Sequence, residues 1–246
     1  MTVSYIGDRE VGKTHLALEL ANPQSNHIKI ISPEYSILKT MLYNELQGRT
    51  VPTNDTLQIR QLQIQIDLPS ARRNLDIDWL DSSGENWRES WRRQNQDKWQ
   101  IFLDTLRKSE GIILVLSPYR ELIHQGKQED FITQAQWCKR FAKWVYFFRY
   151  ECHKLRHLLI CLNKADLFCD VEQEGRFLSY NLKGSQLNWQ QRNDYVFKKY
   201  FSPIKEQILE LNQKTDIDSV RFFITSIKNR DLLELPWLYL GTYLGY

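Results

Sequence analysis

Short apolar runs recur along the chain, and polar stretches of helical length separate them. The runs 111–117 and 155–162 are almost continuously apolar, which is typical of strands that are covered on both faces of a sheet. The run 56–68 alternates apolar and polar residues, which favours a half-exposed or edge strand. The strands that this pattern predicts are 3–6, 27–32, 56–68, 75–80, 111–117, 155–162 and 220–226.

Helical patterns fill the stretches between these strands. They predict helices at about 12–21, 34–46, 98–109, 129–150 and 188–211. Alternating strands and helices favour an α/β fold with a mostly parallel sheet, an antiparallel edge strand and helices on both faces. The 246 residues contain no Gly/Ser/Pro-rich linker, so we expect a single domain that spans residues 1–246.

Composition and charge narrow the functional classes. The net charge of +3 gives no electrostatic reason to expect a nucleic-acid partner. The chain has neither a signal-peptide core nor an uncharged apolar run long enough to cross a membrane, so we expect a cytoplasmic protein. The four cysteines form no C-x-x-C pair, which favours reduced thiols over disulfides or a zinc site.

A phosphate-binding motif follows the first predicted strand. Residues 7–14 read G-D-R-E-V-G-K-T, which matches G-x-x-x-x-G-K-[ST] between a strand and a helix. The two glycines let the loop curl so that its amides face an anion, and the helix N-terminus adds a positive dipole. Lys13 would reach the β- and γ-phosphates, and the Thr14 hydroxyl would ligate Mg²⁺. The expected nucleotide contacts in this segment are Gly7, Asp8, Arg9, Glu10, Val11, Gly12, Lys13, Thr14 and His15.

A base-reading motif, N-K-A-D, occupies residues 163–166, directly after a predicted strand. Asp166 can accept two hydrogen bonds from guanine, one from N1–H and one from the exocyclic amine. Adenine offers neither donor in that arrangement, and a buried carboxylate without partners would reject it. Lys164 can lay its stem along the purine ring, and Asn163 can tie this loop to the phosphate loop.

A second base contact is expected after the last strand, where residues 225–228 read T-S-I-K. This segment resembles the S-A-K loop of GTPases, with Ile227 in place of Ala. The resemblance implies that Ser226 and Ile227 contact the nucleotide, with a backbone amide bound to guanine O6.

The order of these motifs, together with D-S-S-G at 81–84, resembles the Ras-like small GTPases of the translation-factor-related P-loop class. The resemblance covers essentially the whole chain, to about Lys228. It implies a three-layer P-loop GTPase fold and a GTP/GDP switch that uses Mg²⁺. It further implies that Thr14 and Asp81 hold the metal, directly or through water, and that the amide of Gly84 senses the γ-phosphate.

The layout departs from a compact Ras-like protein before the first switch. The segments 27–32 and 34–46 add a strand and a helix there. In this respect the chain resembles certain bacterial Ras-like GTPases of multi-gene systems more than a eukaryotic Ras.

Two metal-site assignments have alternatives. Thr53 follows Pro52 and precedes a strand, so it is our choice for the switch I threonine, but Thr50 is the next candidate in the same short polar loop. Asp76 and Asp78 share the strand parity of Asp81. Gly84, three residues further on, decides for Asp81.

Glu85 occupies the place of the family's catalytic Gln. An ionised Glu cannot donate a hydrogen bond to the transferring phosphoryl group, and its charge lies near the γ-phosphate. Two such charges a few ångströms apart cost on the order of a few kcal/mol at an effective dielectric near 20, which predicts slow hydrolysis. Alternatively, Glu85 acts as a general base whose charge is offset by Arg88, Arg9 or Arg92, a partner supplies an arginine, or Glu85 only pairs with Arg88 at the surface. The expected catalytic residues are Glu85, Lys13 and Thr53.

Aromatic residues follow the second switch. Trp87 and Trp91 lie one helical turn apart and, with Arg88, are expected either to contact a partner or to anchor the switch to the core. Trp99 is expected to pack in the core. Trp137, Phe141, Trp144 and Phe148 follow helical spacing in 134–150 and are expected to be buried in the core, with a groove for a partner as the alternative. The apolar segment 232–246 is expected to cap the domain, with docking on a partner or a membrane as alternatives; the missing cationic face disfavours a membrane.

These features predict a GTP/GDP-binding switch with slow, Mg²⁺-dependent GTP hydrolysis. Residues 48–56 and 82–98 would change with the nucleotide and control a partner protein. The rival interpretation is a GTP-binding scaffold that does not cycle, and the N-K-A-D motif disfavours an ATPase. The sequence leaves the oligomeric state open.

Overall fold

The computed structural model describes the chain apart from residues 1, 9, 24–26, 45–48, 51–57, 82–92, 181–186, 215–216, 218 and 245–246. At 44, 49–50, 81 and 213–214 it describes the backbone alone.

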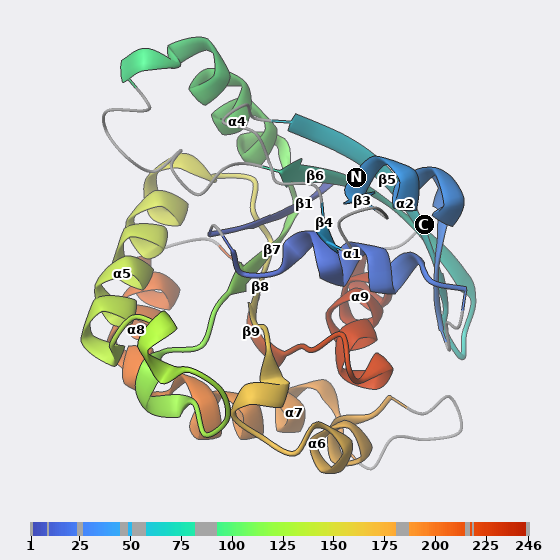
Figure 1. Cartoon of the computed structure of the whole chain (residues 1–246). Coiled ribbons are helices and arrows are strands. Elements are labelled where there is room, and N and C mark those ends of the chain that lie inside the picture. Colours follow the sequence, from blue (N-terminus) through green and yellow to red (C-terminus); the bar gives the residue numbers. More distant parts are fainter. Residues whose placement is uncertain are drawn as a thin grey trace.

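A seven-stranded sheet in the order β2-β5-β6-β1-β7-β8-β9 forms the centre of the described structure (Figure 1). Strands β6, β1, β7, β8 and β9 pair in parallel, whereas β5 is antiparallel to both of its neighbours. The strands are β1 (Thr2–Gly7), β2 (Ile28–Ser32), β5 (Gln58–Asp67), β6 (Arg72–Asp81), β7 (Gly111–Leu116), β8 (His157–Leu162) and β9 (Ser219–Ile224). The predicted α/β class, with a mostly parallel sheet and antiparallel pairing at one side, is therefore confirmed.

The edge of the sheet lies one strand further out than the alternation in 56–68 suggests. Strand β5 is half-exposed, as predicted, but β2 from the additional unit pairs with its outer side and becomes the edge. The predicted helix 34–46 also ends early, because α2 (Tyr35–Leu42) gives way to a small hairpin of β3 (Tyr43–Asn44) and β4 (Arg49–Thr50).

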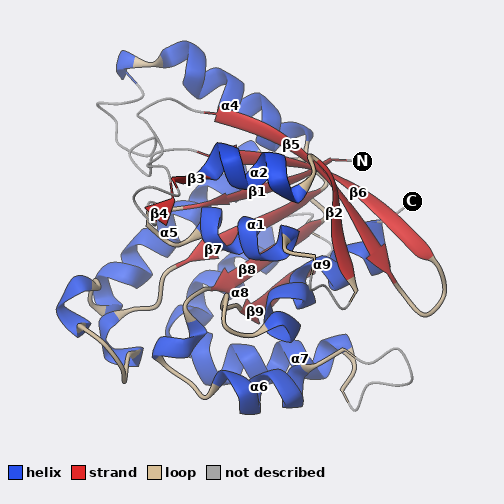
Figure 2. Cartoon of the chain, turned by 45° about the vertical axis from the view of Figure 1, so that its right-hand side comes forward, coloured by secondary structure: helices blue, strands red, loops and turns tan. Residues whose placement is uncertain are grey.

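Helices cover both faces of the sheet (Figure 2). Helices α1 (Lys13–Ala21) and α9 (Arg230–Leu244) lie on one face, and α4 (Gln96–Lys108) and α5 (Gln134–Glu151) lie on the other. Helix α5 begins at Gln134, later than predicted, because Thr133 and Gln136 form a capping box there.

The segment predicted as one helix over 188–211 is divided. Helix α7 (Trp189–Val196) runs into a π-helical turn (Phe197–Phe201), then a 3₁₀ turn (Ser202–Ile204) and α8 (Lys205–Lys214). Pro203 in the 3₁₀ turn has no backbone N–H to continue the preceding helix. Helix α6 (Val171–Leu178) was not predicted and packs against α9.

The aromatic side chains lie where core packing was expected. Trp137, Phe141, Trp144 and Phe148 of α5 are all at most 4% exposed. The Trp99 ring of α4 meets the Phe147 ring of α5 edge-on, with centroids 6.4 Å apart, so this tryptophan packs α4 against the core. None of the helices in the described part of the chain is long and apolar enough to cross a membrane.

The C-terminal segment caps the sheet as helix α9. Its Gly241 lies so close to β5 that an added Cβ would be 2.7 Å from the Ile66 Cδ1 atom. The buried carboxylate of Glu234, on the same helix, accepts hydrogen bonds from Arg230 Nε (2.7 Å) and the His27 backbone N–H (2.9 Å). Arg230 also donates to the Leu20 carbonyl near the end of α1 (2.8 Å), so one ion pair joins α9, α1 and the start of β2.

We expect Glu234→Ala to lower the free energy of unfolding by about 3–5 kcal/mol, because it leaves the Arg230 guanidinium in a largely buried site without its carboxylate. Urea unfolding followed by circular dichroism measures this change. Glu234→Gln is the matched control, since it keeps the shape and one acceptor oxygen and should lose less. An alanine variant that unfolds at the wild-type urea concentration would show that the pair contributes nothing.

Candidate functional site

The phosphate loop lies at the C-terminal end of β1 and leads into α1. The Lys13 ammonium is buried and donates hydrogen bonds to the carbonyls of Gly7 (3.0 Å) and Asp8 (2.8 Å). Gly12 has φ +92°, and an added Cβ there would be 2.7 Å from the Asn163 Nδ2 atom. This left-handed backbone and close approach explain the second glycine of the motif. Thr14 follows in the first turn of α1 and is half-buried.

Asn163 connects three loops that are far apart in the sequence. Its Nδ2 donates to the Val11 carbonyl in the phosphate loop at 2.7 Å. Its Oδ1 accepts a hydrogen bond from Thr225 Oγ1 at 3.1 Å, after the last strand. The structure therefore brings the G-x-x-x-x-G-K-T, N-K-A-D and T-S-I-K segments together at the C-terminal ends of β1, β8 and β9.

The Asp166 carboxylate is held from the T-S-I-K loop. Ser226 Oγ donates to Oδ1 at 2.6 Å, and the Lys228 ammonium lies 2.8 Å from Oδ2. Burial alone would raise the pKa of Asp166, but the hydrogen bonds from Lys228 and Ser226 outweigh it and hold the pKa below its usual value. Asp166 is therefore ionised at neutral pH, and each of its oxygens keeps a lone pair for a further donor.

Lys164 lies two residues before Asp166 in the sequence, and Ile227 lies between Ser226 and Lys228. Lys164 adopts φ 60°, and its ammonium lies 5.3 Å from the Phe131 ring centroid. Burial lowers the pKa of Lys164, partly offset by Glu10 and Asp166. Ile227 is 45% exposed.

Helix α5 contacts the phosphate loop from the other side. The Trp144 side chain hydrogen-bonds the Asp8 carboxylate, and the Arg140 charge acts on the same group. Burial outweighs both and raises the pKa of Asp8. On α1, partial desolvation of the His15 ring and the nearby Lys164 charge lower the pKa of His15.

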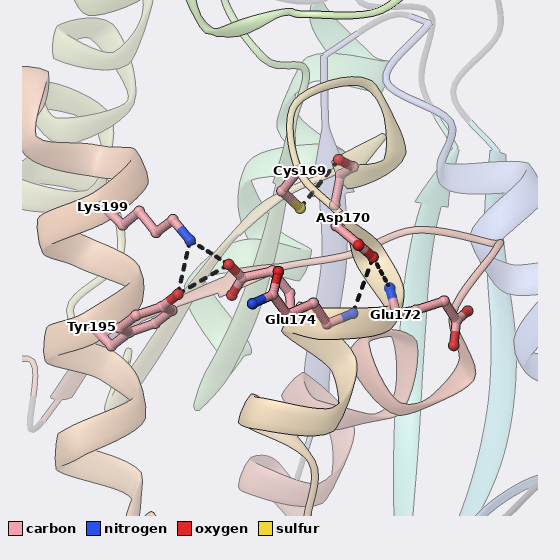
Figure 3. Close-up of polar contacts among 8 residues, drawn as sticks. Cys169, Asp170, Glu172, Glu174, Tyr195 and Lys199 are labelled. Carbon is pink, nitrogen blue, oxygen red and sulfur yellow. Dashed lines mark hydrogen bonds and ion pairs between the residues drawn. The ribbon is translucent and has the colours of Figure 1, made fainter.

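Helix α6 follows the base-reading loop directly in the chain (Figure 3). The Cys169 thiol donates to the Ala165 carbonyl at 3.3 Å. Asp170 caps α6 by accepting from the backbone N–H of Glu172 at 3.0 Å. Further along α6, the buried Glu174 accepts hydrogen bonds from Tyr195 (2.9 Å) and from Lys199. These contacts cap the start of α6 and join it to α7 and the π-helical turn.

Several of these supporting residues were not predicted from the sequence. Lys228 and Thr225 belong to the T-S-I-K segment, but a single sequence does not reveal that they hold Asp166 and Asn163. An Asp followed by acidic residues in a first helical turn, as at Asp170, is an ordinary helix-start signal that could have located α6. No sequence signal indicates that Trp144 contacts Asp8.

Several predicted residues lie outside the described part of the chain, and their roles stay predictions. They are Arg9, Thr53, Gly84, Glu85, Trp87, Arg88, Trp91 and Arg92. The predicted switches 48–56 and 82–98 are described only at 49–50 and 93–98.

The strand register places the three candidate metal-binding aspartates at different distances from the phosphate loop. Trp79 lies opposite Tyr5, so Asp81 ends β6 on the side of the sheet where the parallel strands finish, which is also where the phosphate loop begins. Asp76 and Asp78 lie opposite Thr2 and Ser4, near the other end of β1. Thr50, the second candidate for switch I, pairs with Tyr43 in the β3–β4 hairpin.

Comparisons with known proteins find similarity to solved structures only, at low sequence identity. No protein-family model and no curated protein matches the chain. One similar solved structure is that of a probable GTP-binding protein engB, at 12% identity and TM-score 0.45 over 98% of this chain and 97% of that one. Another is that of a GTP-binding protein from the hyperthermophilic archaeon Sulfolobus solfataricus in complex with GDP, at 13% identity and TM-score 0.47 over 99% of this chain. The match covers 53% of the archaeal protein, about half its length. At sequence identities of 12% and 13%, the ligands and activities of those proteins are not assigned to this chain.

Proposed function

We propose that this chain is a GTP/GDP-binding switch that hydrolyses GTP slowly with the help of Mg²⁺. The observation that carries the proposal is the position of Asn163, which bonds to both the phosphate loop and the T-S-I-K loop. A phosphate-binding loop and a base-reading loop that share one side chain can hold the two ends of a nucleotide at a fixed separation.

The phosphate loop fits an anion. Lys13 now donates to two neutral carbonyls, and a phosphate oxygen offers it a charge-assisted hydrogen bond that is about twice as strong. The N-terminus of α1 directs its amides and dipole toward the same place. The side chain of Thr14 fits a Mg²⁺ ligand at the start of this helix. Bound Mg²⁺ would neutralise charge on the β- and γ-phosphates, with Thr53 and Asp81 as its other proposed protein ligands.

The base-reading loop fits guanine. Asp166 is ionised, oriented by Ser226 and Lys228, and retains acceptor capacity for two N–H donors. An adenine in the same place would offer no such donors and would leave the carboxylate without partners.

Slow turnover is proposed from the sequence position of Glu85. We expect Glu85→Gln to raise the single-turnover rate of GTP hydrolysis by about ten- to a thousand-fold, because it removes a negative charge near the γ-phosphate. Quenched-flow chromatography of GTP and GDP measures the rate, with Glu89→Gln from the same segment as the control. Unchanged or slower hydrolysis in Glu85→Gln would show that Glu85 does not restrain the reaction.

The proposed output is a partner protein that contacts the second switch through Trp87, Arg88 and Trp91. Trp and Arg side chains commonly dominate the binding energy of interfaces.

The test of the function as a whole is to identify the nucleotide that copurifies with the protein and follow it in time. Bound GTP that converts slowly to GDP supports a switch, whereas GTP that stays intact supports a scaffold that does not cycle.

A further inference from the structure

Helix α5 is unusual in its charge distribution. Between Gln134 and Tyr150 it contains no Asp or Glu, while Lys139, Arg140 and Lys143 follow one another within about one turn. The inner side of the helix is apolar and buried, so these cations belong to its outer side.

Two tyrosines extend the cationic side along the helix. Lys139, Lys143, Tyr146 and Tyr150 recur at helical spacing and are all exposed, and we name them the α5 strip. The strip spans about 16 Å along the helix axis. Tyr146 is 66% exposed and Tyr150 48%, which is a large apolar area for side chains of a single helix.

The tyrosine pair is already ordered. The two ring centroids are 4.6 Å apart, and the Arg149 guanidinium lies 4.9 Å from the Tyr150 centroid. Tyrosine rings held in this way offer a rigid contact surface with little entropy left to lose on binding.

The two lysines of the α5 strip lack acidic partners. Among the residues that the structure describes, Lys139 and Lys143 take part in no ion pair, whereas the Arg140 charge acts on Asp8 of the phosphate loop. The acidic residues at the borders of α5 are already used. Arg149 binds Glu210 of α8 at 2.5 Å, and Glu151 binds Arg107 of α4.

We propose that the α5 strip is a docking surface for an acidic segment of a partner protein. Carboxylates of the partner would meet Lys139 and Lys143, and an apolar side chain would lie against Tyr146 and Tyr150. A nucleic acid is a poorer fit, because even a single nucleic-acid-binding module buries about 600–1,000 Å² and neutralises a series of phosphates. The strip is too short to bury such an area, and the net charge of +3 is too small to neutralise a series of phosphates.

The strip lies on the same helix as a contact to the phosphate loop. The inner side of α5 carries Trp144, which hydrogen-bonds Asp8. A partner bound on the strip would therefore act on the helix that supports the nucleotide site. This connection rests on the proposed function, whereas docking on the strip does not.

The test is a binding titration in nucleotide-free buffer, so that it does not depend on the proposed function. The probe is a fluorescein-labelled helical peptide with glutamates and leucines along one side, followed by fluorescence anisotropy. Lys139→Glu/Lys143→Glu should weaken binding by about ten-fold or more. The matched control, Lys29→Glu/Lys198→Glu, carries the same charge change at exposed positions elsewhere and should stay within about two-fold of the wild type. Tyr146→Ala/Tyr150→Ala should weaken binding by about ten-fold without changing its salt dependence.

Thermal unfolding of each variant confirms that it is folded before binding is compared. No binding by the wild type, or an equal loss in the control pair, would overturn the proposal. So would an RNA oligonucleotide of equal charge that displaces the peptide and loses affinity in the same variants.

Discussion

Replacing Lys13 by alanine is expected to weaken GTP and GDP binding by at least about a hundred-fold. The ammonium is buried in the loop that would hold the phosphates, and removing one partner of a buried charged hydrogen bond costs about 2–5 kcal/mol. A factor of a hundred corresponds to about 2.8 kcal/mol, so the expected loss lies within this range. Titration of nucleotide-free protein with a fluorescent GTP analogue measures the dissociation constant.

Two controls separate binding from folding. Lys29→Ala removes an exposed lysine of the edge strand and should leave the dissociation constant unchanged. The unfolding midpoint of nucleotide-free Lys13→Ala reports the loss of two lysine–carbonyl hydrogen bonds, which should lower stability by about 1–3 kcal/mol. If Lys13→Ala binds GTP as tightly as the wild type, the loop is not a phosphate site.

Replacing Asp166 by asparagine is expected to remove the preference for guanine. Asparagine has the same shape but only one acceptor oxygen, and its amide N–H groups would face the N–H donors of the base. We expect GTP affinity to fall by about a hundred-fold or more while ATP affinity stays nearly constant. Competition between the fluorescent GTP analogue and each unlabelled nucleotide measures both quantities.

Asp170→Asn is the matched control for this change. Asp170 lies four residues further on and caps α6, and asparagine caps a helix about as well as aspartate. This variant should bind both nucleotides as the wild type does. An equal loss of GTP and ATP affinity in Asp166→Asn would show that Asp166 only supports the loop and does not read the base.

The parts of the fold that the sequence predicts well are those with a strong local pattern. The strands β7 and β8 read as continuous apolar runs, and the structure buries both completely. The alternation in 56–68 favours a half-exposed or an edge strand and does not choose between them, because a strand at the edge and a strand beside the edge show the same alternation when one face is exposed. Which of them forms the edge depends on β2, a partner distant in sequence.

In the candidate site, too, contiguous motifs were predictable from the sequence, whereas contacts between distant loops were not. The glycine at position 12 and the lysine at 13 belong to a contiguous motif, and their geometry follows from it. The ion pair between Asp166 and Lys228 crosses from one loop to another and depends on the register of β8 and β9. The short helix α6 was missed, because eight residues give too little periodicity to stand out from a polar loop.

The measurement that tests the central claim most directly is the affinity of the nucleotide-free wild-type protein for GTP compared with ATP. The convergence of Lys13, Asn163 and Asp166 predicts a GTP dissociation constant at least about a hundred-fold lower than that for ATP. Equal affinity for the two nucleotides, or binding of neither, would contradict the account.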